Sequence, residues 1–230
     1  MSERSLPRLL VILLLTAMLT ACGAERAALP SRVYVAIGAS DSVGVGARKP
    51  ETEGWVPRLH ATMPEGTRLV NLGVSGAVIS EALDQQLPVA LDAQPTVVTV
   101  WLAVNDLKDG VSLRLYERDL NLLLMELEST GATVLVGNMP DLTSLPLSDA
   151  VLQAYGAPSR VALHAEIARW NASIARIASR HGAIIVDLHA GWRELRTHPE
   201  YLSGDGFHPS SQGYARLAQV WRARLQSTPR

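Results

Sequence analysis

Five short apolar segments recur along the chain after residue 31, and each of them ends at a glycine or a polar residue. They cover residues 32–37, 68–72, 96–104, 132–137 and 183–188. Their apolar residues are continuous rather than alternating, which is typical of strands in a parallel sheet that is covered on both faces. The pattern therefore predicts five buried strands.

Three further segments repeat apolar residues at helical spacing. Ser112 can cap a helix that extends to about Ser129, and Ser159 can cap a longer one that glycine ends at residue 182. A last helix is expected over residues 210–225, with Pro209 suited to its first position. Strands that alternate with helices predict a three-layer α/β/α sandwich with a mostly parallel five-stranded sheet.

The first residues follow a different pattern. Arg4 and Arg8 precede a mostly apolar run of thirteen residues, 9–21, that ends at Cys22. A membrane-spanning helix needs about 20 apolar residues, so this run suits the core of a signal peptide better. The four residues Leu-Thr-Ala-Cys at 19–22 resemble the bacterial lipobox.

The lipobox resemblance implies a lipoprotein signal peptide over residues 1–21 and acyl chains on Cys22. Residues 22–31 would then be a tether, and residues 32–230 a single domain. We expect the mature protein to be exported and lipid-anchored on the extracytoplasmic face of the bacterial cell envelope, with the membrane as a partner. An uncleaved anchor or an ordinary secretory signal is the alternative.

Composition and charge narrow the remaining possibilities. The chain has 230 residues, a formal net charge of -1 and 47% apolar residues, which is typical of a folded globular domain. A net charge so close to zero gives no sign of the excess positive charge that binds nucleic acid, so we expect no nucleic-acid partner. Cys22 is the single cysteine, so no internal disulfide can form. We expect a monomer.

Candidate chemistry follows the predicted strands. Ligands of parallel sheets bind at the carboxyl ends of the strands, which here are followed by Ser40, Gly73 and Asn105. With a fourth block, these positions resemble the SGNH (GDSL-like) hydrolase family, in the family's order. The four blocks are GASDSVG at 38–44, NLGVSG at 71–76, VND at 104–106 and DGFHP at 205–209. The resemblance implies a flavodoxin-like fold and ester hydrolysis without a cofactor.

These blocks supply a catalytic set. A serine hydroxyl needs a neighbouring base to act as a nucleophile, and His208 is the candidate base for Ser40. Asp205, three residues earlier, is placed to orient the imidazole, as in serine-protease triads. By resemblance, the oxyanion hole consists of the backbone N–H groups of Ser40 and Gly73 and the side-chain amide of Asn105.

Several alternatives accompany this interpretation. Ser42 is a rival nucleophile, and Ser40 is preferred because its spacing from the flanking glycines matches the family pattern. The chain departs from the family at Ala39, where Asp is usual, and at Ala103, where Gly is frequent. Asp205 and His208 could instead ligate a metal, but the other histidines show no recognised metal spacing, so we expect no metal site.

The sequence thus predicts an exported serine esterase or lipase-like enzyme that forms an acyl-enzyme on Ser40. Its expected substrates are small-molecule, polysaccharide or lipid esters, and the segment 138–146 is expected to form part of the pocket wall. The alternative is a solute- or carbohydrate-binding lipoprotein without catalysis, or a silent domain of the same family.

Overall fold

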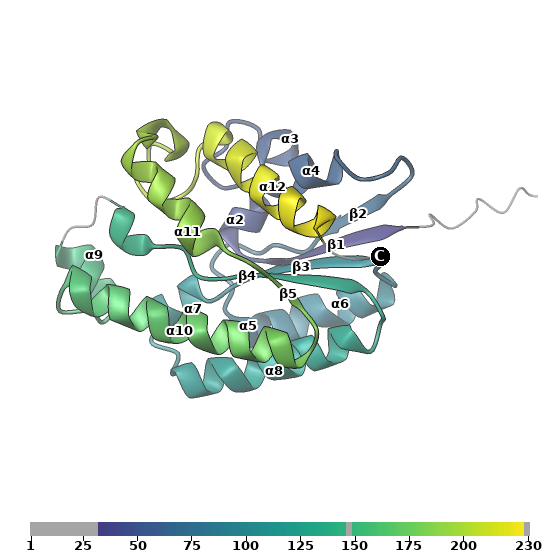
Figure 1. Ribbon diagram of the computed structural model, residues 1–230, viewed down its shortest axis with the longest axis horizontal. Coiled ribbons are helices and arrows are strands. Elements are labelled where there is room, and N and C mark those ends of the chain that lie inside the picture. Colours follow the sequence, from purple (N-terminus) through teal and green to yellow (C-terminus); the bar gives the residue numbers. More distant parts are fainter. Residues whose placement is uncertain (1–31, 146–148, 228–230) are drawn as a thin grey trace, which may run out of the picture. The chain divides into compact units, whose positions relative to one another are not determined.

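The computed structural model describes residues 32–145 and 149–227, and within them five strands form one parallel sheet in the order β2-β1-β3-β4-β5 (Figure 1). The strands are β1 (Val33–Gly38), β2 (Arg68–Asn71), β3 (Val97–Trp101), β4 (Thr133–Gly137) and β5 (Ile184–Val186). Chain order reverses between β1 and β3, as in flavodoxin-like sheets. The predicted fold class is confirmed.

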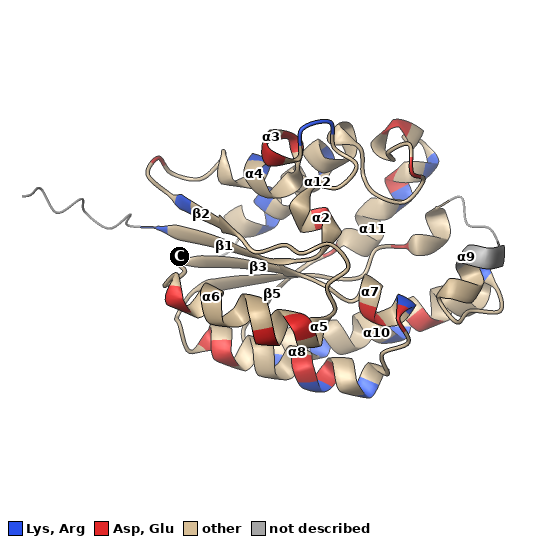
Figure 2. Cartoon of the chain, turned by 180° about the vertical axis from the view of Figure 1, so that it is seen from behind, with Lys and Arg blue, Asp and Glu red and all other residues tan. Residues whose placement is uncertain are grey.

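Helices cover both faces of this sheet, which makes three layers (Figure 1). One face carries α5 (Ile79–Glu81), the π-helix η1 (Ala82–Gln86), α6 (Leu87–Asp92), α8 (Leu113–Glu128) and α10 (Arg160–Arg180). The other carries α3 (Pro50–Glu53), α4 (Trp55–His60), α11 (Leu188–Trp192) and α12 (Ser211–Gln226). The shorter elements are α2 (Ser40–Val43), α7 (Val104–Lys108), α9 (Asp149–Ala154) and the 3-10 turns η2 (Leu142–Ser144), η3 (Arg193–Arg196) and η4 (Pro199–Tyr201). Charged residues lie mainly on the helices and loops (Figure 2).

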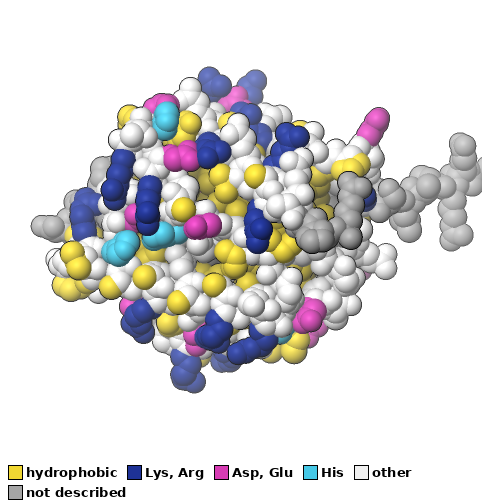
Figure 3. Space-filling model, in the orientation of Figure 1, with side chains coloured by type: hydrophobic (Ala, Val, Ile, Leu, Met, Phe, Trp, Pro, Cys, Tyr) yellow, Lys and Arg dark blue, Asp and Glu magenta, His cyan; other side chains and the backbone are white. Residues whose placement is uncertain are grey.

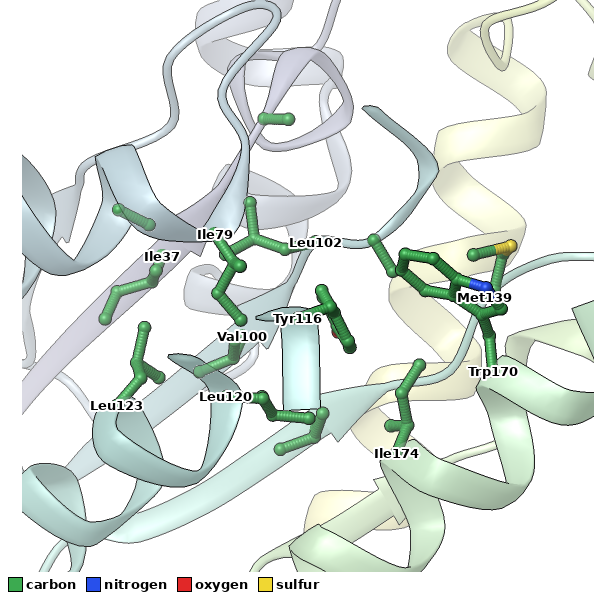
Figure 4. Close-up of a cluster of buried hydrophobic side chains, with 14 of the residues drawn as sticks. Ile37, Ile79, Val100, Leu102, Tyr116, Leu120, Leu123, Met139, Trp170 and Ile174 are labelled. Atoms are coloured by element: carbon green, nitrogen blue, oxygen red, sulfur yellow. The ribbon is translucent and has the colours of Figure 1, made fainter. Parts of the chain in front are cut away.

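Each face of the sheet buries its own apolar cluster. Figure 4 shows Ile37 and Val100 of the sheet in one apolar cluster with Leu120 of α8 and Ile174 of α10. On the opposite face the cluster is aromatic, and the rings of Trp55 and Trp221 stack with their centroids 4.6 Å apart. Burial of each large apolar side chain stabilises the fold by about 1.5–3 kcal/mol, so the continuous apolar strands are explained by cover on both sides.

The predicted long helices are confirmed, together with their serine caps. The Oγ atoms of Ser112 and Ser159 accept hydrogen bonds from backbone N–H groups three residues later. Ser210 Oγ accepts from both Gln212 and Gly213. Because Ser210 is itself the cap of α12, the expectation that Pro209 opens this helix was wrong; Pro209 instead forms a β-bridge with Leu202.

Two strands are shorter than predicted. β3 ends at Trp101 rather than at residue 104, because Ala103 has φ 105° and ψ -34°, which breaks the strand, and α7 follows at once. Asn105 therefore lies on a short helix. β5 ends at Val186, because the Asp187 carboxylate accepts the Ala190 N–H and starts α11.

The predicted signal peptide, Cys22 and the tether lie outside the described residues. The chain from residue 32 onward forms one compact unit. Among the described helices, none combines the length and apolar character needed to cross a bilayer.

Candidate active site

Ser40, His208 and Asp205 form a continuous hydrogen-bonded chain at the carboxyl edge of the sheet. Ser40 is the first residue of α2, directly after β1. Its Oγ lies 3.0 Å from His208 Nε2, although 168 positions separate the two residues. His208 Nδ1 lies 2.7 Å from Asp205 Oδ2. A carboxylate only accepts, so Nδ1 carries the proton and Nε2 is free to accept the serine proton.

Asp205 is organised by its own loop. Its Oδ1 accepts hydrogen bonds from Ser203 Oγ at 2.7 Å and from the N–H groups of Phe207 and His208 at 2.8 and 2.9 Å. Partial burial opposes ionisation, but the hydrogen bonds from His208, Ser203 and the two N–H groups outweigh it and hold the pKa of Asp205 well below its usual range. The carboxylate is therefore charged at neutral pH and fixed in orientation.

Gln86 holds the end of the strand that precedes Ser40. Its side-chain amide accepts from Gly38 N–H at 2.9 Å and donates to Gly38 C=O at 3.1 Å. Gln86 lies in the π-helix η1, a local irregularity that is frequent near functional sites. Sequence reasoning missed this residue, because a glutamine within a helical segment has no signature of such pairing.

The structure separates the two candidate serines. A Cβ on Gly38 would lie 2.1 Å from Ser42 Oγ. The Ser42 side chain therefore packs directly against Gly38 at the end of β1, and only glycine leaves room for it. Ser42 is 1% exposed, and its hydroxyl has no hydrogen-bond partner within the described part of the chain. Ser40, by contrast, is partly exposed and lines a pocket. Ser40 is therefore the serine that a substrate can reach.

The three expected oxyanion donors are placed differently from one another. The Ser40 N–H lies in the first turn of α2, where position alone leaves it without an intrahelical acceptor. Asn105 lines the same pocket and uses one side-chain N–H on the Ala77 carbonyl at 3.1 Å, which leaves the other for a ligand. Gly73 packs against α2, and its N–H donates to Asn71 Oδ1 at 3.1 Å.

Position 73 requires a glycine because α2 packs closely against it. A Cβ there would lie 2.8 Å from Ser42 Cβ and 3.0 Å from Val43 N. The close neighbour is therefore α2 rather than the ligand. Asn71 also holds this segment against α2, because its side-chain amide donates a hydrogen bond to the Ser42 backbone carbonyl at 2.7 Å.

Asp41, next to the candidate nucleophile, is a second carboxyl group near His208 that sequence reasoning did not single out. Burial raises the pKa of Asp41 to about 6, although the positive charge that His208 can carry and the Tyr214 hydroxyl lower it. Tyr214 donates mainly to the Val45 carbonyl at 2.6 Å and lies 3.5 Å from Asp41 Oδ1. The edge of the site thus holds a carboxyl group that titrates close to neutral pH.

Asp106 ties α7 to the first residue of α5. It is fully buried, and its Oδ1 accepts the Ile79 N–H at 3.0 Å. Its other oxygen has no partner among the described residues, and burial raises its pKa to about 6. Asp106 and the neighbouring Asn105 together hold α7 against the loop at Ala77.

The pocket at Ser40 is small and is lined by both small and aromatic side chains. Its walls are formed by Ala39, Ser40, Asp41, residues 101–105 and Phe207. Of the described residues of the segment 138–146, none lines this pocket; instead Met139, Leu142 and Leu145 are buried in the core. The described apolar side chains of this segment pack inward, and its expected part in the pocket wall stays a prediction.

Comparison with known proteins identifies the fold and the family. The GDSL-like Lipase/Acylhydrolase family matches residues 36–216, most of the chain. The chain belongs to this family. It is accordingly a serine carboxylic ester hydrolase of the SGNH type. No curated protein sequence matches it.

Solved structures agree with this assignment at the level of fold. An acetylxylan esterase, Axe2 from Geobacillus stearothermophilus, superposes with a TM-score of 0.68 at 20% identity, covering 86% of this chain and 95% of that one. A lipase/acylhydrolase from Enterococcus faecalis gives 0.66 at 19% identity, covering 86% and 98%. LAE5, an alpha/beta hydrolase from the metagenome of Lake Arreo, gives 0.68 at 21% identity, covering 87% and 97%.

Proposed function

We propose that this family member is an esterase for short acyl groups that works through an acyl-enzyme on Ser40. The observation that carries the proposal is the chain of contacts from Ser40 Oγ through His208 to Asp205, with 3.0 and 2.7 Å separations. These distances are those of hydrogen bonds ready to transfer a proton.

The reaction follows from these contacts. Ser40 Oγ attacks the ester carbonyl carbon while its proton passes to His208 Nε2, and Asp205 stabilises the resulting imidazolium. The tetrahedral intermediate collapses, the bond to the alcohol oxygen breaks, and His208 returns the proton to that oxygen. Water then attacks the acyl-Ser40 ester with His208 again as base, which releases the acid and restores the serine.

The oxyanion would be stabilised by Ser40 N–H, Gly73 N–H and Asn105 Nδ2. Because Gly73 N–H donates to Asn71 Oδ1 in the free enzyme, this donor must turn from Asn71 Oδ1 to the developing negative charge. A charged acceptor forms the stronger hydrogen bond, so the exchange favours the transition state over the ground state. Each donor of this kind typically contributes about 10²–10³-fold in rate.

The pocket favours a small acyl group. The hollow beside Ser40 is small, and its lining includes Ala39, Ala103, Trp101 and Phe207, which suits a small acyl group. One of the similar structures is an acetylxylan esterase, which gives an acetylated sugar as a concrete candidate substrate. We infer that the enzyme prefers acetyl esters to long-chain lipids.

We also propose that the enzyme works outside the cytoplasm, anchored by acyl chains on Cys22. The support is sequence alone: two arginines, the apolar run 9–21 and the Leu-Thr-Ala-Cys motif. Several acyl chains together anchor a protein firmly, since each buried CH₂ contributes about 0.8 kcal/mol.

A fluorophosphonate probe tests the nucleophile. The full-length protein should be labelled, and Ser40→Ala should not be, whereas Ser42→Ala, a matched change two residues away, should keep labelling. In the same preparation p-nitrophenyl acetate should be hydrolysed with a higher kcat/KM than p-nitrophenyl octanoate. Labelling that survives in Ser40→Ala would overturn the acyl-enzyme on Ser40. Failure of the folded wild type to react would favour a binding protein.

A further inference from the structure

Asp141, His164 and His189 come together in the fold although they are far apart in sequence. Asp141 precedes η2, His164 lies in the second turn of α10, and His189 lies at the start of α11. One ligand atom from each residue lies within 4.8 Å of the other two. Figure 3 shows neighbouring histidine side chains at the surface near α9 and α11. No short motif links these positions, which is why the sequence predicted no metal site.

The most buried member of this cluster is a carboxylate. Asp141 is 2% exposed, and its oxygens accept from the N–H and hydroxyl of Thr143 and from Ser144 Oγ. Burial opposes its ionisation, but these hydrogen bonds and the nearby His189 lower its pKa below the ordinary value. The cluster therefore contains a negative charge whose orientation is fixed by the hydrogen bonds from Thr143 and Ser144.

The histidines still have nitrogen atoms to offer. His189 Nδ1 is buried and has no hydrogen-bond partner among the described residues. A buried ring nitrogen without a partner normally costs about 1–3 kcal/mol, so its persistence calls for an explanation. His164 Nδ1 lies 4.0 Å from Asp141 Oδ1, too far for a hydrogen bond, and the His164 side chain is 53% exposed. Both rings are thus available to a common ligand.

The other histidine–carboxylate contacts of the described chain differ from this cluster. His181 and His198 each lie within 2.9 Å of a glutamate oxygen, in closed pairs with Glu128 and Glu200. His208 is committed to Asp205 and Ser40. At Asp141 the ligand atoms of the three residues instead lie within 4.8 Å of one another, and His164 forms no hydrogen bond with the carboxylate.

We propose that Asp141, His164 and His189 bind a divalent transition-metal ion, with Zn²⁺ as the best fit. Two imidazoles and one carboxylate suit Zn²⁺, whereas Mg²⁺ and Ca²⁺ prefer oxygen ligands throughout. Ligands at about 2.0–2.2 Å from a tetrahedral ion lie roughly 3.4 Å apart. The three ligand atoms, which lie within 4.8 Å of one another, must therefore move closer together to hold the ion. The exposed His164 side chain can make that movement by a rotamer change.

Such an ion would join three segments that are otherwise held by separate contacts: the loop after β4, α10 and α11. A fourth coordination position would face solvent beside His164 and hold water. The ion would stabilise the folded chain, since it binds the native arrangement and finds no such cluster in the unfolded one. The site is independent of the proposed ester chemistry, because it shares no residue with the Ser40 pocket.

The test is Zn²⁺ binding to the full-length protein after removal of metals with EDTA and exchange into chelator-free buffer. Competition with a chromophoric chelator should give one tight site, and His164→Ala and His189→Ala should each weaken it at least 10-fold. Excess Zn²⁺ should raise the melting temperature of the wild type by about 5 °C, and should leave both variants within about 1 °C of their metal-free value. Mg²⁺ and Ca²⁺ should have no effect.

Two matched variants distinguish this site from other histidines. His198→Ala removes a histidine that contacts a carboxylate outside the cluster, and His208→Ala removes the candidate base. Both should keep the tight site. Equal Zn²⁺ affinity in wild type and His189→Ala would overturn the proposal, as would loss of the site in His208→Ala alone. Circular dichroism of the metal-free variants checks that each is folded before Zn²⁺ is added.

Discussion

At the scale of single residues, Ala103 is strained where the chain turns from β3 into the helix that carries Asn105. Its φ of 105° lies in the region that glycine occupies freely, and its methyl group is buried. An L residue pays about 1–3 kcal/mol for such a conformation. The family's frequent glycine at this position thus has a physical reason, and the strain fixes the direction in which α7 leaves the sheet.

Ala103→Gly should therefore be tolerated far better than a glycine at an unstrained buried alanine. Ala36 in β1 is the matched control, since it is fully buried in regular strand conformation. Both changes delete one buried methyl group and raise the conformational entropy of the unfolded chain, but only Ala103→Gly relieves backbone strain. In urea unfolding, Ala36→Gly should cost about 1–3 kcal/mol more than Ala103→Gly. Equal costs would contradict the strain.

Asp106 should make stability depend on pH. Its pKa is raised to about 6 in the folded chain, against about 3.9 unfolded. Between those values the native state holds a proton that the unfolded state has lost, so stability falls as pH rises through this window and is constant above it. The stability of the wild type relative to Asp106→Asn should decrease by about 1–3 kcal/mol between about pH 4.5 and pH 7.5.

Urea unfolding at the two pH values measures this difference. Any cost of burying the new amide is the same at both, so it cancels and leaves the titration of Asp106. Asp84→Asn, on an exposed position of η1, is the control for the substitution of an aspartate by asparagine. A wild-type advantage over Asp106→Asn that stays constant, or that grows with pH, would contradict the raised pKa.

At the scale of elements, the loop with Asp205 and His208 rests on the turn after α2. Gly46 in that turn has φ 94°, and a Cβ there would lie 2.6 Å from the Pro209 carbonyl oxygen and 3.0 Å from His208 Cβ. The backbone of the turn after α2 thus touches the backbone of the loop that carries His208. Because neither can move aside cheaply, this contact sets how closely His208 approaches Ser40.

Gly46→Ala should reduce kcat by at least about 10-fold, since a misplacement near 1 Å can cost as much as 10²-fold. Gly66→Ala is the matched control: Gly66 also has positive φ, at 80°, but nothing lies within 4 Å of the added Cβ. Both changes carry the backbone cost of alanine at positive φ. Hydrolysis of p-nitrophenyl acetate by folded protein should fall only for Gly46→Ala, and similar rates for both would refute the contact.

Element type was more predictable than element ends. The apolar repeats and the caps at Ser112 and Ser159 are local signals, so the long helices were found from sequence. The end of β3 depends on the φ of Ala103, and an alanine gives no sign of positive φ in sequence. The start of α12 depended on whether Pro209 opened the helix or Ser210 capped it, and the bridge between Leu202 and Pro209 keeps Pro209 outside the helix.

At the scale of the whole molecule, sequence predicted only those residues of the candidate site that stand in a recognisable motif. Ser40, Asp205, His208 and Asn105 stand in recognisable blocks, and the parallel sheet brings the ends of β1 and β3 side by side. Gln86 stands in no block, and its contact with Gly38 depends on how η1 packs against the sheet. Such contacts across long sequence separations follow from the tertiary fold rather than from local pattern.

The expected signal peptide at residues 1–21 and the expected lipid on Cys22 lead to a prediction at this scale. If Cys22 carries acyl chains, Cys22→Ser should lose incorporation of labelled palmitate in a bacterial host and should move from the membrane fraction to the soluble one after cell lysis. Esterase activity per folded molecule should be unchanged, because residue 22 precedes the domain that begins at 32. Ala24→Ser, a similar change two residues later, controls for the substitution itself. A Cys22→Ser protein that stays in the membrane would show that the apolar run 9–21 remains as an uncleaved anchor, because lipid on the cysteine would then not be what holds the chain.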